Sequence, residues 1–402
     1  MIGDLLKMQQ AVREAGLDAW LLFDFRGSNY LAWSMLHLPP ETHSTRRWMV
    51  AIPAHGEPIK IVHRMEQYPL ASVKGKQIIY DTHESWAEAV SSVAKSGSTV
   101  AMEYSPMGAL PVVSTVDAGT IELIRSFGAT VVSSADLLQQ FTAVLTEEQL
   151  ATTAVTAGQL KASVMEAFKF IRDRVNASSD GVTEYDVQQH LVKTLEDKGL
   201  AMDHPPIVAI GVNAANPHYA PTYAETSMIK KDMVVLIDAW AKRNSPGAVY
   251  ADITWVGYTG SAVPVDIDAS FKVIAAARDA AIDLVKTRFA GGEPVMGCEV
   301  DRACRDVVEQ AGLGSAFIHR TGHNISTEVH GSGANMDDFE THDTRKIVRG
   351  TTFSIEPGVY FPDSLGLRTE IDVVIGHDGT VTIPSEPIQH TILPLLSDTW
   401  TG

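Results

Sequence analysis

Cysteine is scarce in this sequence, since its 402 residues contain only Cys298 and Cys304. Two cysteines six positions apart build neither a disulfide framework nor a CxxC zinc site, so we expect a reducing compartment. Long apolar runs are missing too, because no stretch of about 18 apolar residues occurs. Residues 1–20 have the pattern of an amphipathic helix without the apolar segment of a secretion signal. These absences predict a cytoplasmic protein without a membrane partner.

Basic residues are too few to balance the acidic ones. Lys and Arg number 32 against 49 Asp and Glu, which gives a net charge of −17. A protein of this charge repels phosphate groups, so neither nucleic acid nor an anionic membrane is expected as a partner. The G-x-S-x-G elbow of serine hydrolases and the P-loop of nucleotide-binding proteins are also absent, which argues against those two enzyme classes.

The segments that are present indicate two domains. Before residue 142, apolar strand-like runs alternate with helical segments, the pattern of an α/β layer domain whose sheet is covered on both faces. A long helical run over residues 145–175 follows, opened by a Thr-x-x-Gln capping box at Thr146. We therefore predict an N-terminal α/β domain over residues 1–143 and a second domain over residues 144–402.

The second domain contains an internal duplication. Residues 181–200 (GVTEYDVQQHLVKTLEDKGL) resemble residues 297–314 (GCEVDRACRDVVEQAGLG), at an offset of about 115 positions that suits a duplicated half-domain. Each copy reads as a helix that is followed by apolar strands. Two such halves facing each other predict an α+β domain with a pseudo-twofold axis and a cleft between its sheets.

Charged side chains stand in apolar, strand-forming runs of the second half. Glu356 lies in SIEPGVY, where Pro and Gly end the strand, and Glu370 lies in LRTEIDVVI. A carboxylate in such a run costs several kcal/mol unless it is paired or bound to a metal. The preceding stretch FIHRTGHNISTEVHGSG supplies three histidines, which are His319, His323 and His330.

The first half offers matching carboxylates. Asp238 in VVLIDAW and Asp252 in YADITW lie in two strands joined by a turn over residues 244–247, so a hairpin would direct both into one pocket. Carboxylates and imidazoles bind hard or borderline divalent ions. Five such ligands suit two metal ions about 3.5–4 Å apart. The predicted ligands are Asp238, Asp252, His323, Glu356 and Glu370.

This ordered set resembles the pita-bread metallopeptidases, especially their proline-specific branch, prolidase (Xaa-Pro dipeptidase) and aminopeptidase P. That branch has an additional His before the first Asp, matched by His218, and three histidines spaced four and then seven, matched in 319–330. It also has an Arg two residues before the last Glu, matched by Arg368. The GVTEYDV and EPGVY segments match as well. The resemblance implies a creatinase-like α/β N-terminal domain followed by a pita-bread catalytic domain.

The resemblance further implies how the metals are held. Asp238 would chelate one ion, with Asp252 bridging. His323 and Glu356 would bind the other ion, and Glu370 would bridge both, around a shared hydroxide that attacks the scissile carbonyl. The ions implied are two divalent cations, manganese first, with cobalt or zinc as alternatives.

Catalytic roles are implied for four residues. Glu356 would carry the proton to the leaving prolyl nitrogen, and His218 and His330 would stabilise the oxyanion and orient the substrate. Arg368 would either hold the carboxylate of a short substrate or support the metals through the bridging Glu370 and Asp252. His319 stays open between a role in the site and structural packing.

The expected substrate is a proline-containing dipeptide or short peptide, and the resemblance implies a homodimer. Dipeptidase and aminopeptidase activity both remain open. A metal-dependent amidohydrolase or lyase on the same fold is an alternative, and so is a non-catalytic pita-bread binding module.

Three positions depart from the family's pattern. Asp238 and Asp252 are 14 residues apart, which is a longer hairpin than usual. Trp240 stands where an Asp-x-Gly sequence is usual, and Gly331 follows His330 where an acidic residue is common. We therefore expect an indole beside the metal site or at its outer wall, and we expect the departures to affect substrate choice more than metal binding.

Overall fold

The computed structural model describes residues 2–39, 41–177 and 181–400. These residues form two compact units, Met1–Thr142 and Ala143–Gly402. Each unit has its own sheets and its own apolar clusters.

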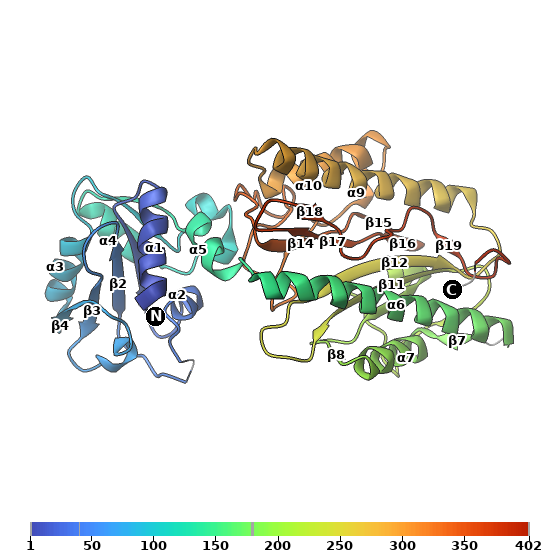
Figure 1. Cartoon of the computed structure of the whole chain (residues 1–402), viewed down its shortest axis with the longest axis horizontal. Helices are drawn as coiled ribbons and strands as arrows, with labels where there is room; N and C mark the ends of the chain where they lie inside the picture. Colours follow the sequence, from blue (N-terminus) through green and yellow to red (C-terminus); the bar gives the residue numbers. More distant parts are fainter. Residues whose placement is uncertain (1, 40, 178–180, 401–402) are drawn as a thin grey trace. The chain divides into compact units, whose positions relative to one another are not determined.

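The first unit is built on one six-stranded sheet in the order β4-β3-β2-β1-β5-β6 (Figure 1). The pairs β1–β2 and β2–β3 are antiparallel and the other pairs are parallel. The strands are β1 (Ala19–Asp24), β2 (Trp48–Pro53), β3 (Ile59–His63), β4 (Lys76–Tyr80), β5 (Thr99–Met102) and β6 (Thr130–Ser133). The α-helices are α1 (Ile2–Glu14), α2 (Tyr30–Met35), α3 (His83–Val93), α4 (Ala118–Ser126) and α5 (Ala135–Thr142).

Helices cover both faces of this sheet, which is why β1 is buried along its whole length. Successive side chains of a strand point to opposite faces. Trp20 and Leu22 pack with residues of α1, α2 and α5, whereas Leu21 and Phe23 pack with residues of α3 and α4. The predicted α/β architecture is confirmed, although the sequence pattern did not identify the short helices α2 and α4.

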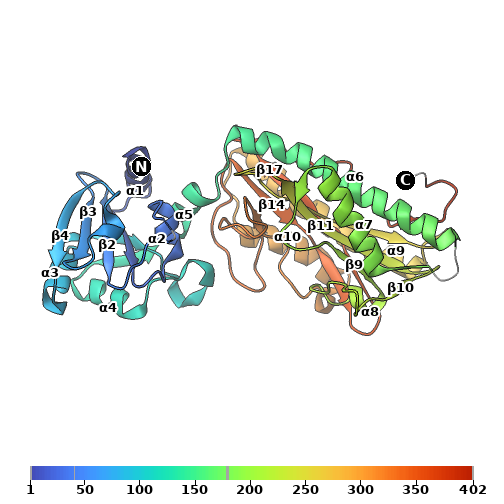
Figure 2. The same cartoon turned by 90° about the horizontal axis from the view of Figure 1, so that it is seen from below.

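The second unit contains two pairs of long helices, two larger sheets and two two-stranded sheets. Helices α6 (Glu147–Ala177) and α7 (Glu184–Asp197) pack with the sheet β19-β12-β11-β8, in which β9 also pairs with β11 (Figure 2). Helices α9 (Val265–Gly291) and α10 (Gly297–Gln310) pack with the sheet β13-β14-β17-β18 (Figure 1). The predicted duplication is therefore present, because each half combines a helix pair with antiparallel strands.

The bounds of the remaining elements follow the sequence closely. The strands of the first half are β7 (Val182–Thr183), β8 (Leu200–Ala201), β9 (Ile207–Ile210), β10 (Met228–Ile229), β11 (Val234–Arg243) and β12 (Ala251–Tyr258), with the short helix α8 (Gly211–Ala214). The later strands are β13 (Asn324–Ile325), β14 (Thr351–Ile355), β15 (Gly358–Phe361), β16 (Leu365–Arg368), β17 (Ile371–Ile375), β18 (Val381–Thr382) and β19 (Leu393–Pro394).

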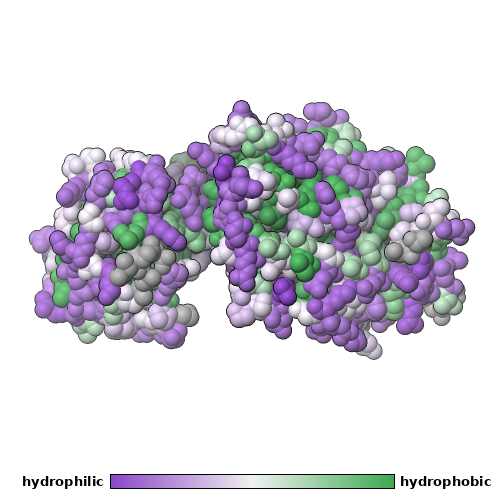
Figure 3. All heavy atoms as spheres, in the orientation of Figure 1, coloured by the Kyte–Doolittle hydropathy of each residue, from purple (hydrophilic) through white to green (hydrophobic). Residues whose placement is uncertain are grey.

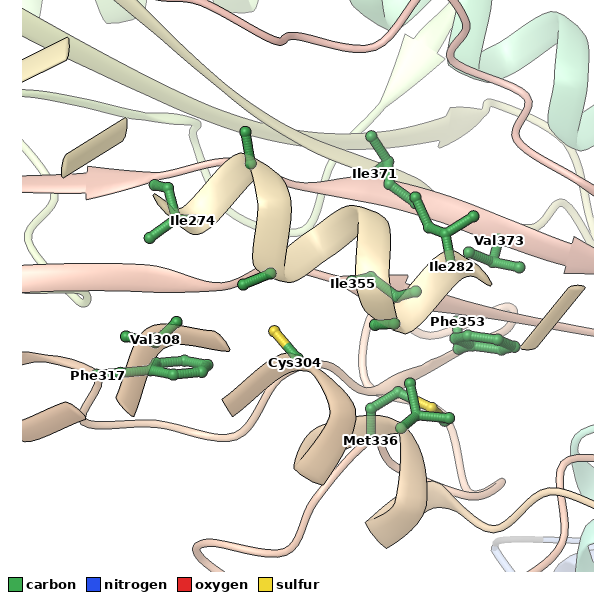
Figure 4. Packing of buried hydrophobic residues seen from close by; sticks show 14 of the residues in the cluster. Ile274, Ile282, Cys304, Val308, Phe317, Met336, Phe353, Ile355, Ile371 and Val373 are labelled. Carbon is green, nitrogen blue, oxygen red and sulfur yellow. The ribbon is translucent and has the colours of Figure 1, made fainter. Parts of the chain in front are cut away.

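The largest apolar cluster lies where α9 and α10 meet the second sheet (Figure 4). Ile274 and Ile282 of α9 and Phe353 of β14 belong to it, together with Cys304 of α10. Burial raises the pKa of the Cys304 thiol to about 12. Both cysteines are free and buried, and Cys304 therefore serves as a packing residue, since thiolate is the reactive form.

The capping box predicted for the long helix is present. Thr146 Oγ1 accepts a hydrogen bond from the N–H of Gln149 at 3.2 Å, and Gln149 Oε1 accepts one from the N–H of Thr146 at 2.9 Å. These bonds satisfy donors that the first turn of a helix leaves free. They place the start of α6 at Glu147, close to the predicted start at residue 145.

Within the part of the chain that the structure describes, no helix combines the length and the apolar character needed to cross a membrane. Figure 3 shows hydrophilic residues over much of the visible face of each unit, with apolar residues gathered in the second unit between α9 and α6.

We propose that residues 1–143 and 144–402 fold as separate domains. The clusters around the site and under α6 draw only on residues from 145 onward. A fragment of residues 144–402 is therefore expected to unfold in one cooperative transition in scanning calorimetry. A fragment of residues 152–402 should melt at a lower temperature, because losing buried Leu145 and Leu150 costs roughly 2–5 kcal/mol each. A 144–402 fragment without a cooperative transition would contradict the proposed boundary.

Candidate metal centre

One face of the β11–β12 hairpin carries the site residues of the first half. β11 pairs with β12 so that Asp238 lies opposite Thr254 and Trp240 lies opposite Asp252. Side chains two positions apart on a strand, and side chains directly opposite each other, project from the same face. Asp238, Trp240 and Asp252 accordingly line a single cavity.

The ligands predicted from the second half lie at the ends of strands. His323 directly precedes β13, Glu356 directly follows β14, and Glu370 directly precedes β17. Strand ends leave the pleated surface, so their side chains can converge while the apolar residues of the strands fill the core. All three side chains line the same cavity as the two aspartates.

Main-chain contacts hold His323 in place. Its N–H donates to Ser354 Oγ at 3.0 Å, and the N–H of Ser354 donates to the His323 carbonyl at 2.9 Å. A Cβ at the preceding Gly322 would lie 2.0 Å from the Ser354 carbonyl oxygen. Only glycine allows the two segments to approach this closely, so Gly322 fixes the path of the chain into His323.

Two contacts join the sheets at the site. The N–H of Glu370 donates to the Thr254 carbonyl at 3.2 Å. The N–H of Asp252 lies 3.2 and 3.1 Å from the two carboxylate oxygens of buried Asp372 in β17. The ends of β12 and β17 are thereby locked together, which brings carboxylates from both halves within reach of one another.

Four of the five predicted ligands meet around His323. Ligand atoms of Asp252, His323 and Glu370 lie within 4.8 Å of one another. His323 Nε2 also lies 3.4 Å from Glu356 Oε1 and 3.8 Å from Asp252 Oδ2. The fifth residue, Asp238, lines the cavity, but its carboxylate is bound to a guanidinium. Carboxylates arranged around one imidazole form a donor set typical of divalent metals.

Burial makes the charges of this cluster costly. Burial, and next the charge of Asp238, raises the pKa of Asp252 well above its usual range. Burial and the charge of Asp252 raise the pKa of Glu370 well above its usual value in the same way. Burial also raises the pKa of Glu356 to about 7 and lowers the pKa of His323 well below its ordinary value. A neutral imidazole beside repelling carboxylates is suited to bind a cation.

An unpaired oxygen shows that the residues fit a metal. Asp252 Oδ1 is buried and has no hydrogen-bond partner among the residues that the structure describes. An unsatisfied buried acceptor costs roughly 1–3 kcal/mol, and more when it is charged. A cation coordinated by Asp252 would remove this cost. The carboxylate-rich donor set suits manganese or a similar ion.

Arg368 is fully engaged by the protein. Its Nη2 pairs with Asp238 Oδ2, its Nε donates to Thr254 Oγ1 at 3.0 Å, and its Nη1 donates to Tyr360 Oη at 3.0 Å. Its hydrogen bonds to described residues reach Glu370 only through Thr254, and the support of Glu370 and Asp252 implied by the resemblance stays a prediction. β16 packs beside β11, which places the guanidinium next to Asp238. The Thr254 hydroxyl lies between the guanidinium and Glu370, and Thr254 Oγ1 is 2.8 Å from Glu370 Oε2.

His319, which the sequence left open, belongs to a hydrogen-bond chain. Its Nδ1 lies 2.7 Å from the Arg320 carbonyl, which can only accept, so Nδ1 carries the proton. Its Nε2 therefore accepts from the Tyr360 hydroxyl at 2.8 Å, and that hydroxyl accepts from Arg368. Burial lowers the pKa of His319 to about 3. His319 is thus a neutral residue that positions Tyr360.

Thr254 and Tyr360 were missed by the sequence analysis. Both are buried polar residues in otherwise apolar strands, and that was the only signal available. Thr254 Oγ1 lies 2.9 Å from Asp238 Oδ1 in the first half and 2.8 Å from Glu370 Oε2 in the second half, and so links both halves.

His218 and His330 lie at exposed positions of the cavity lining. The His330 ring stands edge-on to the His323 ring, with centroids 4.3 Å apart. The loop that carries His218 is tied to Glu184, the first residue of α7. Glu184 Oε1 accepts from the N–H of Ile210 at 2.8 Å, and Oε2 accepts from Tyr219 Oη at 2.7 Å. The GVTEYDV segment therefore supports the site from outside it.

The cavity has a volume of about 440 Å³, which is within the range of small-ligand sites. Six carboxylates, five histidines and two arginines line it, together with the apolar residues Ile207, Pro217, Trp240 and Val329.

Two curated proteins are similar to this chain over about half of its length. One is Probable dipeptidase PepE of Mycobacterium tuberculosis (strain ATCC 25618 / H37Rv), 31% identical over 215 residues, which are 54% of this chain and 53% of that protein. The other is Xaa-Pro dipeptidase of Lactobacillus delbrueckii subsp. lactis, 32% identical over 223 residues, with the same two shares. The chain spans about half the length of the curated relatives it matches.

The likeness in fold extends over the whole chain. The crystal structure of dipeptidase PepE from Mycobacterium ulcerans matches with a TM-score of 0.64 at 22% identity, over 98% of this chain and 97% of that one. The predicted combination of an α/β N-terminal part and a pita-bread part is confirmed at the level of fold. The family model described as Metallopeptidase family M24 matches residues 154–377, more than half of the chain and all five predicted ligands. By this match and the resemblance of its site motifs, the chain belongs to metallopeptidase family M24.

Proposed function

We propose that this protein is a dinuclear metal-dependent peptidase that hydrolyses the Xaa-Pro bond of dipeptides or short peptides. The observation that carries the proposal is the convergence of Asp252, His323, Glu356 and Glu370 around an unpaired buried oxygen. Membership of family M24 supports metal-dependent peptide hydrolysis. The names of two similar proteins, a dipeptidase and an Xaa-Pro dipeptidase, support the proposed substrate.

Two divalent ions would be held by Asp238, Asp252, His323, Glu356 and Glu370. When bound, such ions polarise the scissile carbonyl and increase the acidity of a water molecule. The unpaired Asp252 Oδ1 offers one binding position directly. Asp238 is held by Arg368 and by the Thr254 hydroxyl.

Glu356 is the proposed proton carrier. Its carboxylate is half-buried at the cavity wall, where Oε1 accepts a hydrogen bond from Ser354 Oγ at 3.1 Å. A carboxylate between the attacking water and the leaving nitrogen takes a proton from the first and delivers it to the second. His218 and His330, exposed in the lining, would donate hydrogen bonds to the developing oxyanion and orient the peptide.

Of the two roles considered for Arg368, the contacts favour support of the site. Three of its nitrogens are already bound to Asp238, Thr254 and Tyr360. Its guanidinium is also buried, so it has little freedom to bind a substrate carboxylate as well. We therefore propose Arg368 as a positioning residue for Asp238.

Removal of metal tests the core of the proposal. Chelation and dialysis are expected to abolish hydrolysis of Ala-Pro, because the ions polarise the scissile carbonyl and acidify the water molecule. Added Mn²⁺ should restore the activity, since the buried carboxylates repel one another without cations and therefore bind them again. Elemental analysis should find two ions per chain, and bound Mn²⁺ should raise the melting temperature. A metal-free protein that cleaves Ala-Pro at the full rate would contradict the proposal.

Substitution of site residues separates ligands from positioning residues. His323→Ala and Glu356→Gln are expected to leave no measurable turnover of Ala-Pro. His319→Ala should lower kcat/KM by about 10–100-fold, since it acts only through Tyr360 and Arg368. His190→Ala is the matched control, because His190 stacks on Phe170 at 4.2 Å and does not line the cavity. Equal losses in His323→Ala and His190→Ala would contradict these assignments.

Chain-length preference is tested by comparing Ala-Pro, Ala-Ala and Ala-Pro-Ala in the presence of Mn²⁺. We expect Ala-Pro to be cleaved faster than Ala-Ala. Product analysis that shows cleavage of Ala-Pro alone identifies a dipeptidase, whereas cleavage of Ala-Pro-Ala as well identifies an aminopeptidase. Equal rates for Ala-Pro and Ala-Ala would contradict the proposed proline specificity.

A further inference from the structure

Trp240 is the largest apolar side chain in the lining of the metal-site cavity. It lies two residues after Asp238 on β11 and directly opposite Asp252 on β12. The three side chains therefore project from one face of the hairpin. The indole stands immediately beside two predicted metal ligands in the lining of the cavity.

The indole is fixed in its position. Its Nε1–H donates to Asp203 Oδ1 at 2.7 Å. Its ring packs between two apolar clusters, one around Ile207 and Leu236 and the other around Tyr250. Asp203 follows β8, which pairs with the end of β11, so the hydrogen-bond acceptor and the indole belong to the same small sheet. The hydrogen bond and the packing contacts fix the orientation of the ring, which therefore forms a rigid part of the cavity wall.

The β11–β12 hairpin also forms hydrogen bonds with a second segment of the cavity lining. Lys242 Nζ donates to the Thr327 carbonyl at 2.6 Å, and the N–H of Tyr250 donates to the Ser326 carbonyl at 3.0 Å. These bonds fasten the loop that carries Val329, another apolar residue of the cavity lining. The extra hairpin residues thus connect the indole to the loop that leads to His330.

We infer that Trp240 determines substrate specificity, by presenting an apolar wall of fixed shape to one residue of the peptide next to the metal centre. This inference rests on the proposed function. Trp240, Ile207 and Val329 supply apolar surface on that side of the cavity. An anionic substrate side chain placed there would lose its hydration beside the carboxylate of Asp203, which also lines the cavity, and a bulky one would collide with the indole. The favoured residue carries a small apolar side chain.

Two substrate panels with the manganese-loaded protein test this inference. The first varies the residue before the bond (Gly-Pro, Ala-Pro, Leu-Pro, Phe-Pro, Lys-Pro), and the second varies the residue after it (Ala-Pro, Ala-Ala, Ala-Phe). Trp240→Ala is expected to raise kcat/KM for the largest member relative to the smallest by about tenfold or more in one panel. The change should appear in KM more than in kcat, with Trp240→Phe between Trp240→Ala and the unaltered protein.

Trp255→Phe is the matched control. Trp255 lies on β12 of the same hairpin, but it belongs to the cluster under α6, and Lys161 Nζ stands 5.4 Å from its ring centroid. Its substitution should leave the ranking of both panels unchanged. If Trp240→Ala no longer melts cooperatively or no longer retains manganese, Trp240→Leu and Trp240→Phe supply the comparison. An unchanged ranking in both panels for folded, metal-loaded Trp240 variants overturns the inference.

A binding measurement separates this inference from the proposed function. Dipeptide analogues with the carbonyl of the central bond reduced to CH₂ are not hydrolysed, and calorimetry gives their Kd. If the unaltered protein cleaves no Xaa-Pro peptide, the proposed function fails. The inference still holds if Trp240→Ala changes the ranking of analogue affinities by about tenfold, and it fails if that ranking is unchanged.

Discussion

Mutual repulsion among buried carboxylates is the constraint on which the second unit depends. Asp252, Glu356 and Glu370 lie close to one imidazole, and Asp238 stands behind them. The guanidinium of Arg368 pairs with Asp238, and the guanidinium of Arg320 also lines the cavity. Among the described residues, no Lys or Arg forms an ion pair with Asp252, Glu356 or Glu370, and Asp252 Oδ1 has no hydrogen-bond partner. A buried site with this charge is suited to bind cations.

The two halves support this cavity in the same way, each through a buried carboxylate on its second helix. Glu184 of α7 binds the backbone and a side chain around the loop of His218. Asp301 of α10 accepts from the N–H of Thr321 at 2.9 Å and pairs with Arg305. Arg305 in turn donates to the carbonyl of His319 at 2.8 Å. The helices of the duplicated halves therefore do more than cover sheets, because each one aims a segment that carries site histidines.

The departures from the family's pattern have different consequences. Gly331 is required by packing, since a Cβ there would lie 2.2 Å from Asn324 Oδ1, and an acidic side chain does not fit. Trp240, in contrast, lines the metal-site cavity itself. The common fold and ligand set therefore identify the family, and the substrate preference that we infer rests on Trp240 and its neighbours.

The sequence by itself determined the elements whose signal is local. Capping at Thr146, the hairpin that carries Asp238 and Asp252, and the paired helices follow from short-range patterns, and all five predicted ligands line one cavity. Tertiary structure decided the partner of Arg368, the neutral state of His319 and the linking role of Thr254. Each of these depends on which strands pack side by side, here β16 beside β11 and β12 against β17. Residue types and their spacing do not predict which distant strands become neighbours. Hydrogen bonds between segments more than 100 positions apart exist only once both sheets are assembled.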